Sequence, residues 1–594
     1  MSRALASLLL ATLSACTAPN PAFLAGSGSD AQTSSGASDA TSASSTSPTI
    51  TTAATDSGGG SGGPTATSVD ASGDVSTSLP VTTTAAPDAG TSPGCGDGVL
   101  DVGEQCDDGP NNSDEGACTA QCHVAFCGDG LVHAGLEQCD DGPNNGDGGA
   151  CTNSCALAVC GDGLVHLGLE QCDDGNQLDE DGCQKDCTLL AVEKIVAGGT
   201  FTCALLSHGK VRCWGGNAHG QLGLGDIQSR GDQPGELPTP YVALGDLPAL
   251  DVAAGTDSTC AVRSDGTVLC WGNNESGQLG IGSTVKMGDN PGDFPLQPVK
   301  LGIGAARITS GGGFHCALTG QEKVRCWGNN LLGQLGVGST NNLGDDVLDL
   351  LTTDVPLGLI VAGVFAGVSH TCAYDGNGAL RCWGHGQAGK LGYDNVVTLG
   401  DNPGELPPVF GNVKLGAAAT SGGAGLSSTC VHTANQRVRC WGDGNFGKLA
   451  NGSSMGIGGG PGFTPMLDLG DIPLIAPDLD VQQLAVGAQH ACVLVGAGVV
   501  RCWGFNGEGR LGLGHVNSIG DQPDELPLKI AVDLGAPALA IYSGSAANHT
   551  CAVLEGGHVR CWGNNALGQL GVGSLQHVGD NESPTVDTPV LPGP

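Results

Sequence analysis

The chain has 594 residues, of which 103 are Gly, 27 are Cys and 4% are aromatic. Its 22 Lys and Arg against 60 Asp and Glu give a net charge of −38. This charge excludes proteins that bind nucleic acid or an anionic membrane face through a basic patch. So many Cys are typical of an exported, disulfide-bonded protein and unusual in a reducing cytosol.

The N-terminus has the pattern of an export signal. Arg3 precedes a run of apolar residues at 4–13, which is too short to span a bilayer. The sequence Leu-Ser-Ala-Cys at 13–16 resembles the lipobox of bacterial lipoproteins. The resemblance implies a signal peptide at 1–15, with acylation of Cys16 and localisation at the outer membrane or cell surface of a Gram-negative bacterium. The alternative is a plain secretory peptide that leaves Cys16 in the mature chain.

Residues 16–93 are Ser, Thr, Ala, Gly and Pro with few large apolar side chains. Such a segment cannot bury enough apolar surface to offset its backbone entropy. We therefore predict a disordered linker that acts as a tether.

Residues 94–188 contain one module three times. The copies begin with Cys-Gly-Asp-Gly at Cys95, Cys127 and Cys160, and each continues to Glu-Gln-Cys-Asp-Asp-Gly. The segment resembles the Myxococcus-type cysteine-rich repeat of exported proteins. Four Cys per module predict two disulfides each, with the pairing undetermined, because so few apolar residues cannot form a core. A four-Cys zinc site per module is the alternative.

Each module also gathers carboxylates near Gly-bearing turns, and this pattern has two interpretations. Calcium prefers several carboxylate and amide oxygens within one loop. Alternatively, Asp, Asn and Gly are simply turn formers. The candidate ligands are Asp107, Asp108, Asp114, Asp140, Asp141, Asp147, Asp173, Asp174, Asp179 and Asp181.

Residues 189–594 repeat with a period of 56 to 62 residues, marked by Trp214, Trp271, Trp327, Trp383, Trp441, Trp503 and Trp562. A fixed period of this size indicates a solenoid, propeller or array. Each Trp follows a Cys that has a partner ten residues earlier, across a short hairpin that would bring the two together. The predicted disulfides are Cys203–Cys213, Cys260–Cys270, Cys316–Cys326, Cys372–Cys382, Cys430–Cys440, Cys492–Cys502 and Cys551–Cys561.

After the Trp, several copies continue with Asn-x-x-Gly-Gln-Leu-Gly, as at 217–223 and 565–571, whereas the fifth copy has Lys-Leu-Ala at 448–450. Together with the hairpin, this pattern resembles the regulator-of-chromosome-condensation repeat. The resemblance implies an all-β fold, a seven-bladed β-propeller. We expect residues 586–591 to form a last strand that joins the first hairpin and closes the ring.

Three further recurrences have mainly structural interpretations. Arg residues two positions before a Trp predict packing or cation–π contact, and His370, His490 and His549 predict buried structural histidines. Gly-Asp pairs in corresponding loops predict an acidic rim for cations or basic partners, or else turns in which the Asp caps its own backbone. The rim residues are Asp232, Asp289, Asp345, Asp401, Asp521 and Asp580.

Taken together, these patterns predict a cell-surface lipoprotein that is not an enzyme and that binds protein or glycan through one propeller face. The first alternative is an extracellular inhibitor, because a secreted propeller of the resembled family inhibits β-lactamases. A carbohydrate-active enzyme is a further alternative and would need a carboxylate pair in the central channel. The family's best-known member is an exchange factor for a small nuclear GTPase. We expect neither that activity nor a GTPase partner here, because the chain carries an export signal.

Overall fold

The computed structural model describes residues 94–168, 170–177, 183–349, 351–474, 480–526 and 528–591. The expected signal peptide, Cys16 and linker lie outside these residues, as do Asp179 and Asp181. Within the described ranges, every helix is too short or too polar to cross a membrane.

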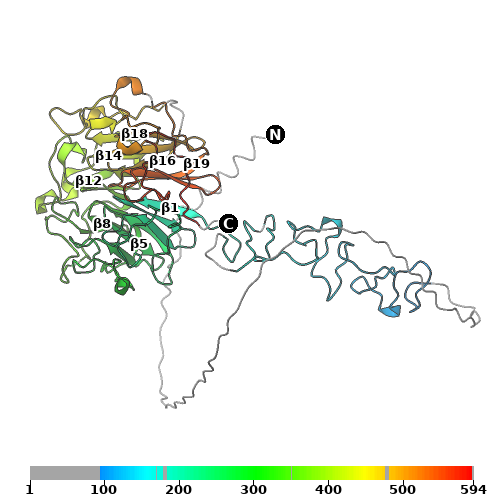
Figure 1. Ribbon diagram of the computed structural model, residues 1–594. Helices are drawn as coiled ribbons and strands as arrows, with labels where there is room; N and C mark the ends of the chain where they lie inside the picture. The colour runs from blue at the N-terminus through cyan, green and yellow to red at the C-terminus, as the bar shows by residue number, and fades with distance from the viewer. Residues whose placement is uncertain are drawn as a thin grey trace, which may run out of the picture. The chain divides into compact units, whose positions relative to one another are not determined.

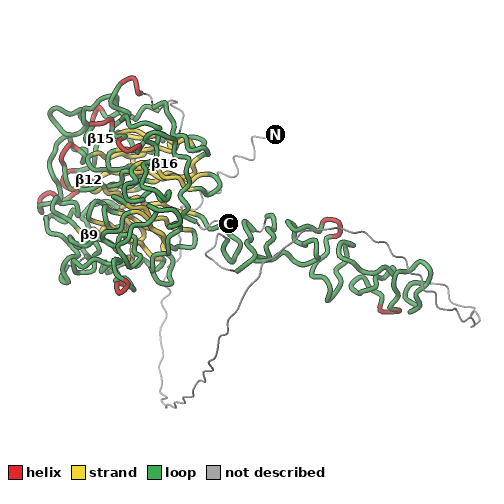
Figure 2. Tube along the Cα trace, viewed as in Figure 1, coloured by secondary structure: helices red, strands yellow, loops and turns green. Residues whose placement is uncertain are grey.

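The described residues after 190 form seven antiparallel sheets of three strands each (Figures 1 and 2). In order, these blades are β1 Val192–Ala197, β2 Phe201–Leu206, β3 Val211–Gly215; β4 Ala249–Ala254, β5 Ser258–Arg263, β6 Val268–Gly272; β7 Ala305–Ser310, β8 Phe314–Thr319, β9 Val324–Gly328; β10 Val361–Ala366, β11 His370–Asp375, β12 Leu380–Gly384; β13 Ala419–Ala424, β14 Ser428–Thr433, β15 Val438–Gly442; β16 Val481–Val486, β17 His490–Val495, β18 Val499–Gly504; β19 Ala538–Tyr542, β20 His549–Leu554, β21 Val559–Gly563.

Short 3₁₀ helices lie in the loops. The cysteine-rich modules contain η2 Gly109–Asn111 and η3 Gly142–Asn144. The propeller contains η4 Pro291–Asp293, η5 Gln387–Gly389, η6 Pro403–Glu405, η7 Pro407–Phe410, η8 Asn445–Gly447, η9 Met466–Asp468, η10 Gly507–Gly509 and η11 Pro523–Glu525. The first strand of each blade contacts the first strands of both neighbouring blades, and β1 contacts β19. The fold is therefore the all-β, seven-bladed propeller that the repeat implied.

Within a blade, the hairpin register explains the Cys spacing. Cys203 lies opposite Cys213 on neighbouring strands β2 and β3, and the other six hairpins have the same register. A disulfide joins the two Cys in all seven blades, as the spacing predicted. Each hairpin is thus covalently closed.

Between blades, the buried Trp makes the recurring contact. All seven indoles are fully buried, and six donate their Nε1–H to a backbone carbonyl in the loop of the preceding blade, at 2.9–3.0 Å. Trp214 of the first blade donates to Gln569 of the seventh, so the same bond closes the ring. The exception is Trp562, whose Nε1 has no partner in the described part of the chain.

A loop glycine makes the second contact at every junction. Gly220 has a φ of +76°, and a Cβ added there would lie 2.4 Å from the backbone nitrogen of Asp289 in the next blade. Gly568 of the seventh blade, with a φ of +78°, meets Asp232 of the first blade in the same way, at 2.6 Å. The loop and the turn that follows in the next blade therefore touch backbone to backbone.

The recurrent His and Arg also join blades. His370, His490 and His549 are buried and bond through Nε2 to a Thr hydroxyl of a neighbouring blade at 2.7–2.8 Å, and burial lowers the pKa of each. Arg212 donates to the carbonyl of Val590 in the last blade at 3.5 Å, and its guanidinium lies 4.1 Å from the ring centroid of Tyr241 in its own blade. The structural interpretation of both sets is correct.

One expectation about ring closure was wrong. The segment at 586–591 does not join the first hairpin: Thr588 donates its backbone N–H to Val559 of the last blade's own β21, at 2.8 Å. Val242 binds Val211 of β3 in the same manner, so the outer edge of the first blade is already occupied by its own returning segment. The last junction is closed by side-to-side packing, like the other junctions.

We predict that Gly568→Ala lowers propeller stability by about 2–4 kcal/mol. The new methyl would meet the turn at Asp232 and would hold a non-Gly residue in the left-handed region. Thermal unfolding followed by Trp fluorescence measures the loss. Gly404→Ala is the matched control, because a Cβ at Gly404 meets nothing within 4 Å. Equal unfolding temperatures for the two variants would contradict the glycine contact.

Candidate functional site

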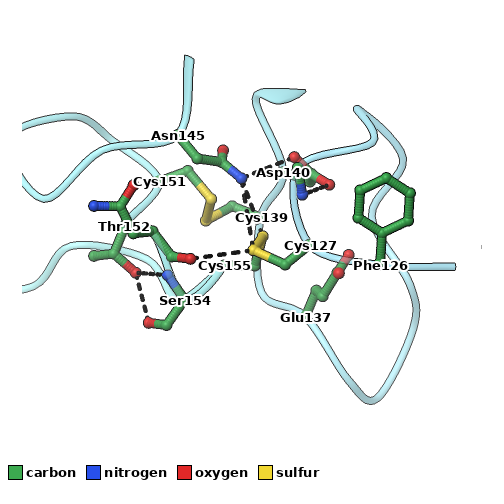
Figure 3. Close-up of a disulfide and its surroundings, with 12 residues drawn as sticks. Phe126, Cys127, Glu137, Cys139, Asp140, Asn145, Cys151, Thr152, Ser154 and Cys155 are labelled. Carbon is green, nitrogen blue, oxygen red and sulfur yellow. Dashed lines mark hydrogen bonds between the residues drawn. A yellow bond between two sulfur atoms is a disulfide. The ribbon is translucent and has the colours of Figure 1, made fainter. Parts of the chain in front are cut away.

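The three cysteine-rich modules share one disulfide pattern. In each, the first Cys bonds the fourth and the second bonds the third: Cys95–Cys122, Cys106–Cys118, Cys127–Cys155, Cys139–Cys151, Cys160–Cys187 and Cys172–Cys183. Figure 3 shows the second module. Carboxylates approach these sulfurs, but every Cys beside them is already in a disulfide. The described modules therefore lack the thiolates that a zinc site needs.

A single carboxylate organises the turns of each module. The Oδ2 of Asp140 accepts the N–H groups of Gly128, Asp129 and Gly130, and its Oδ1 accepts those of Gly142 and the Asn145 side chain. Figure 3 shows the bond from Asn145. Burial raises the pKa of Asp140, but these donors outweigh burial and the net shift is downward. Asp107 and Asp173 occupy the same place in the first and third modules.

This arrangement bears on the calcium interpretation. An ion bound at Asp140 would compete with its backbone donors, and the N–H groups of Gly128 and Gly142 have no other partner among the described residues of the module. Asp114 and Asp147 each accept a further backbone N–H, from Ala120 and Asn153. The contacts are those of turn-capping residues, and calcium binding stays a prediction.

The six Gly-Asp pairs lie in the turns that dock against the preceding blade. Their Asp side chains are partly buried, and a second acid accompanies them: Glu236 accepts the backbone N–H groups of Gly231, Asp232 and Gln233. Burial and the neighbouring Glu236 raise the pKa of Asp232. Asp289, Asp345 and Asp401 also have a raised pKa, from burial and then from a second carboxyl group. These second acids were not among the predicted site residues, although Pro-x-Glu recurs at 234–236, 403–405 and 523–525.

The loops that follow the third strand of each blade form one end of the propeller, which we call the loop face. It comprises residues 216–230, 273–287, 329–343, 385–399, 443–457, 505–519 and 564–578. First and third strands both run toward this end, because the middle strand is antiparallel to each.

Four blades share one form of the first loop turn. In them a Gln side chain accepts the backbone N–H of the residue two positions earlier, for example from His219 to Gln221 at 2.8 Å. Blades four, five and six have Lys390, Lys448 and Arg510 at this position, and these side chains cannot accept.

The turn changes conformation where the acceptor is missing. Ala388, Phe446 and Glu508 take φ values of +61° to +63° with ψ of 12° to 21°, which is the left-handed conformation. Arg510 then donates its Nε–H to the carbonyl of Gly507 at 2.9 Å, which reverses the polarity of the Gln bond. Lys390 and Lys448 donate to other residues, so the three altered turns share only the loss of the Gln acceptor.

The three basic side chains are buried and bonded. Lys390 donates to the Ser369 hydroxyl at 3.0 Å and to the carbonyl of Leu426 at 3.1 Å, and burial lowers its pKa to about 8. Lys448 pairs with Asp443 at 2.5 Å. They brace the loop face and offer little free positive charge to a ligand.

The same loops carry an aromatic pair, of which Phe446 is exposed and Phe505 is partly buried. The rings of Phe446 and Phe505 lie 4.8 Å apart between centroids, and the Arg510 guanidinium lies 4.7 Å from the Phe505 ring centroid. Phe446 is 46% exposed, although a large apolar side chain is usually buried.

Apolar side chains recur at the tips of the loop face. In six blades an exposed aliphatic residue or Met lies three or four positions before the Gly of the Gly-Asp pair, or before Gly458 in the fifth blade, which has Gly-Gly there. These residues are Ile227, Val285, Val396, Val397, Met455, Val516 and Leu575. Leu331 and Leu567 are exposed in neighbouring turns. Exposed apolar residues that recur at one end of a protein indicate an interaction surface.

Comparisons with known proteins agree with this architecture. An RCC1-like domain model matches residues 156–546, and a regulator of chromosome condensation (RCC1) repeat model matches residues 541–569. Ultraviolet-B receptor UVR8 of Arabidopsis thaliana is 30% identical over 388 residues, which are 64% of this chain and 78% of that protein. The E3 ubiquitin-protein ligase HERC2 of Homo sapiens is 30% identical over 373 residues, 62% of this chain but 7% of HERC2. Among solved structures, Prp20p from Saccharomyces cerevisiae is 18% identical, with a TM-score of 0.47, over 66% of this chain and 87% of that chain.

We predict that Asp140→Asn speeds reduction of the second module's disulfides by a phosphine at pH 7, because the charged acceptor of several N–H groups is lost. Since the pKa of Asp140 is lowered in the folded module, its stabilisation is present above the usual value of 3.8 and is lost as the pH falls below it. The wild-type protein should therefore be reduced more slowly than Asp140→Asn at pH 7, and the two reduction rates should become equal in acid. Asp141→Asn is the control; equal rates for both variants at pH 7 would refute the role of Asp140.

We predict that Ala388→Gly raises propeller stability by about 0.5–1 kcal/mol, since Gly adopts positive φ without steric cost. Ala218→Gly is the matched control, because Ala218 lies in an equivalent turn of the first blade at negative φ and should lose about the same amount. If the unfolding temperatures of Ala388→Gly and Ala218→Gly shift in the same direction, the left-handed turn is not strained.

Proposed function

Because the chain belongs to the RCC1-like domain family, we propose that it is a non-enzymatic binding module that recognises a partner protein through its loop face, outside the cytoplasm. Relatives such as UVR8 and HERC2 carry names for quite different activities. The family therefore supports binding in general, and the partner has to be argued from this chain's own surface.

The observation that carries the proposal is the recurrence of exposed apolar side chains on the loop face, together with the aromatic pair at Phe446 and Phe505. Protein interfaces concentrate aromatic and apolar contacts at their centre, with charged residues at the rim. Aliphatic tips and Met455 suit a protein better than a glycan, whose hydroxyl groups need polar partners.

Charge favours a basic partner. The chain carries a net charge of −38, and Glu275, Asp346 and Glu582 are exposed within or beside the loop face. Complementary charge speeds association and weakens with added salt. Binding should therefore decline as ionic strength rises.

The disulfides support export. All 26 described Cys are paired, and Cys16, which lies outside the described residues, is the one Cys left over. Disulfides in this number persist in oxidising compartments. In our proposal, lipid on Cys16 anchors the chain, as the lipobox resemblance implies, and residues 17–93 tether the folded parts to the membrane surface.

An extracellular inhibitor would use the same loop face, with a secreted enzyme as the protein bound. Nucleotide exchange on a GTPase is not part of the proposal, because an exported chain would not meet that substrate.

The experiment uses photocrosslinking from two positions of the full, exported chain. A photoreactive amino acid at Phe446 should capture a discrete protein from cell-surface and culture-medium fractions. The same label at Val409, which is exposed in η7 outside the loop face, should not. Phe446→Asp should weaken binding of the captured protein at least tenfold, and Val409→Asp should leave it unchanged. Equal capture from both positions, or retention by polysaccharide alone, would overturn the proposal.

The anchor has its own test. Cells fed labelled palmitate should incorporate label into the wild-type chain and not into Cys16→Ser, and the variant should move from the membrane to the soluble fraction. A Ser variant that is still labelled, or an unlabelled wild type, would contradict lipidation.

A further inference from the structure

The propeller encloses an axial channel that the proposed binding through the loop face does not use. The first strands of all seven blades line a cavity of about 580 Å³. Cavities of this size hold small organic ligands.

The channel is closed at the loop face by one longer loop. Six blades connect their first and second strands with three residues, whereas the seventh uses the six residues at 543–548. Ser545 reaches across the ring and donates its hydroxyl to the carbonyl of Ser310 in the third blade, at 3.2 Å. Ser543, Gly544 and Ser545 line the cavity, so this loop is its floor. The cavity opens at the end opposite the loop face.

Two layers of side chains make up the wall. The layer near the floor, level with the inner Cys of each hairpin, is mostly apolar and includes Val196, Phe365, Ala485 and Tyr542. The layer nearer the mouth is mostly polar, with Lys194, Asp251, Arg307, Ser421 and Gln483 at equivalent strand positions.

Most of the polar layer is already satisfied by its neighbours. Lys194 pairs with Asp251 at 2.6 Å, and the other oxygen of Asp251 accepts the backbone N–H of Ile308 at 2.9 Å. Gln483 accepts the backbone N–H of Ile541 at 2.9 Å. These side chains hold adjacent first strands together.

Arg307 is the exception in this layer. Its side chain is exposed, and it has no hydrogen bond or ion pair among the described residues. The equivalent position in the next blade is Gly363, where an added Cβ would lie 2.3 Å from the Tyr374 hydroxyl. Arg307 acts electrostatically on Tyr374: burial raises the pKa of this phenol, and the guanidinium opposes the rise. A free guanidinium and a phenol therefore face one cavity.

We propose that the axial channel binds a small organic carboxylate, whose acid group is held by Arg307 and the Tyr374 hydroxyl. The apolar part of the ligand lies deeper, against Phe365 and Tyr542. A guanidinium matches a carboxylate with two parallel N–H bonds, and the apolar wall layer near the floor adds hydrophobic contact without competing charge. The site is independent of the proposed protein interface, since the two lie at opposite ends of the propeller.

The test is calorimetric titration of the full chain with phenylacetate, indole-3-acetate and straight-chain carboxylates of six to ten carbons. At least one should bind, and its uncharged amide should bind at least tenfold more weakly. Arg307→Gln should weaken the binding carboxylate at least tenfold. Lys414→Gln removes the same charge from an exposed site outside the cavity and should leave affinity unchanged.

A second variant separates binding from folding. Tyr374→Phe keeps the ring and removes only the hydroxyl, so it should weaken binding several-fold with an unchanged circular dichroism spectrum. The proposal is overturned if no carboxylate of the series binds at millimolar concentration, if acid and amide bind equally, or if Arg307→Gln retains full affinity in a folded chain.

Discussion

The propeller depends on the contact between each buried Trp and the loop of the preceding blade. The indole supplies a large apolar surface, and its single N–H needs an acceptor once it is buried. The loop carbonyl provides that acceptor in six junctions, and the neighbouring loop glycine lets the two backbones meet closely enough for the bond to form. Removing either partner would leave a buried polar group unsatisfied.

Covalent and non-covalent interactions stabilise different parts of the structure. Disulfides close each hairpin within a blade and cross-link each cysteine-rich module twice, whereas the junctions between blades rely on hydrogen bonds and packing. Cross-links constrain the unfolded chain locally and leave the relative placement of blades to the Trp contacts. This division fits a chain that has only 4% aromatic residues and therefore little large apolar surface for a conventional core.

Local sequence patterns predicted the local structure well. The Cys-Trp spacing predicted the hairpins and their disulfides, because strand register is a property of one short segment. The local pattern could not predict the disulfide pairing in the modules or the path of residues 586–591, because each depends on which segments of the chain meet in the fold. The altered turns at Lys390, Lys448 and Arg510 were visible as departures from Gln, but only the structure shows that losing an acceptor flips the backbone. The three additional residues of the floor loop at Ser545 were visible in the sequence. The role of Arg307 was not, because a side chain without a hydrogen-bond partner can be recognised only once its neighbours in the structure are known.

Ring closure has a topological corollary. The junction between the last and first blades has the Trp bond that five other junctions also have and the glycine contact that all of them have, and no strand of the described chain is shared across it. In such a ring, the closing junction is not structurally distinct from the other junctions. New chain ends could be opened in another inter-blade connection, with the present ends spliced together, and a circularly permuted polypeptide would still find every native neighbour.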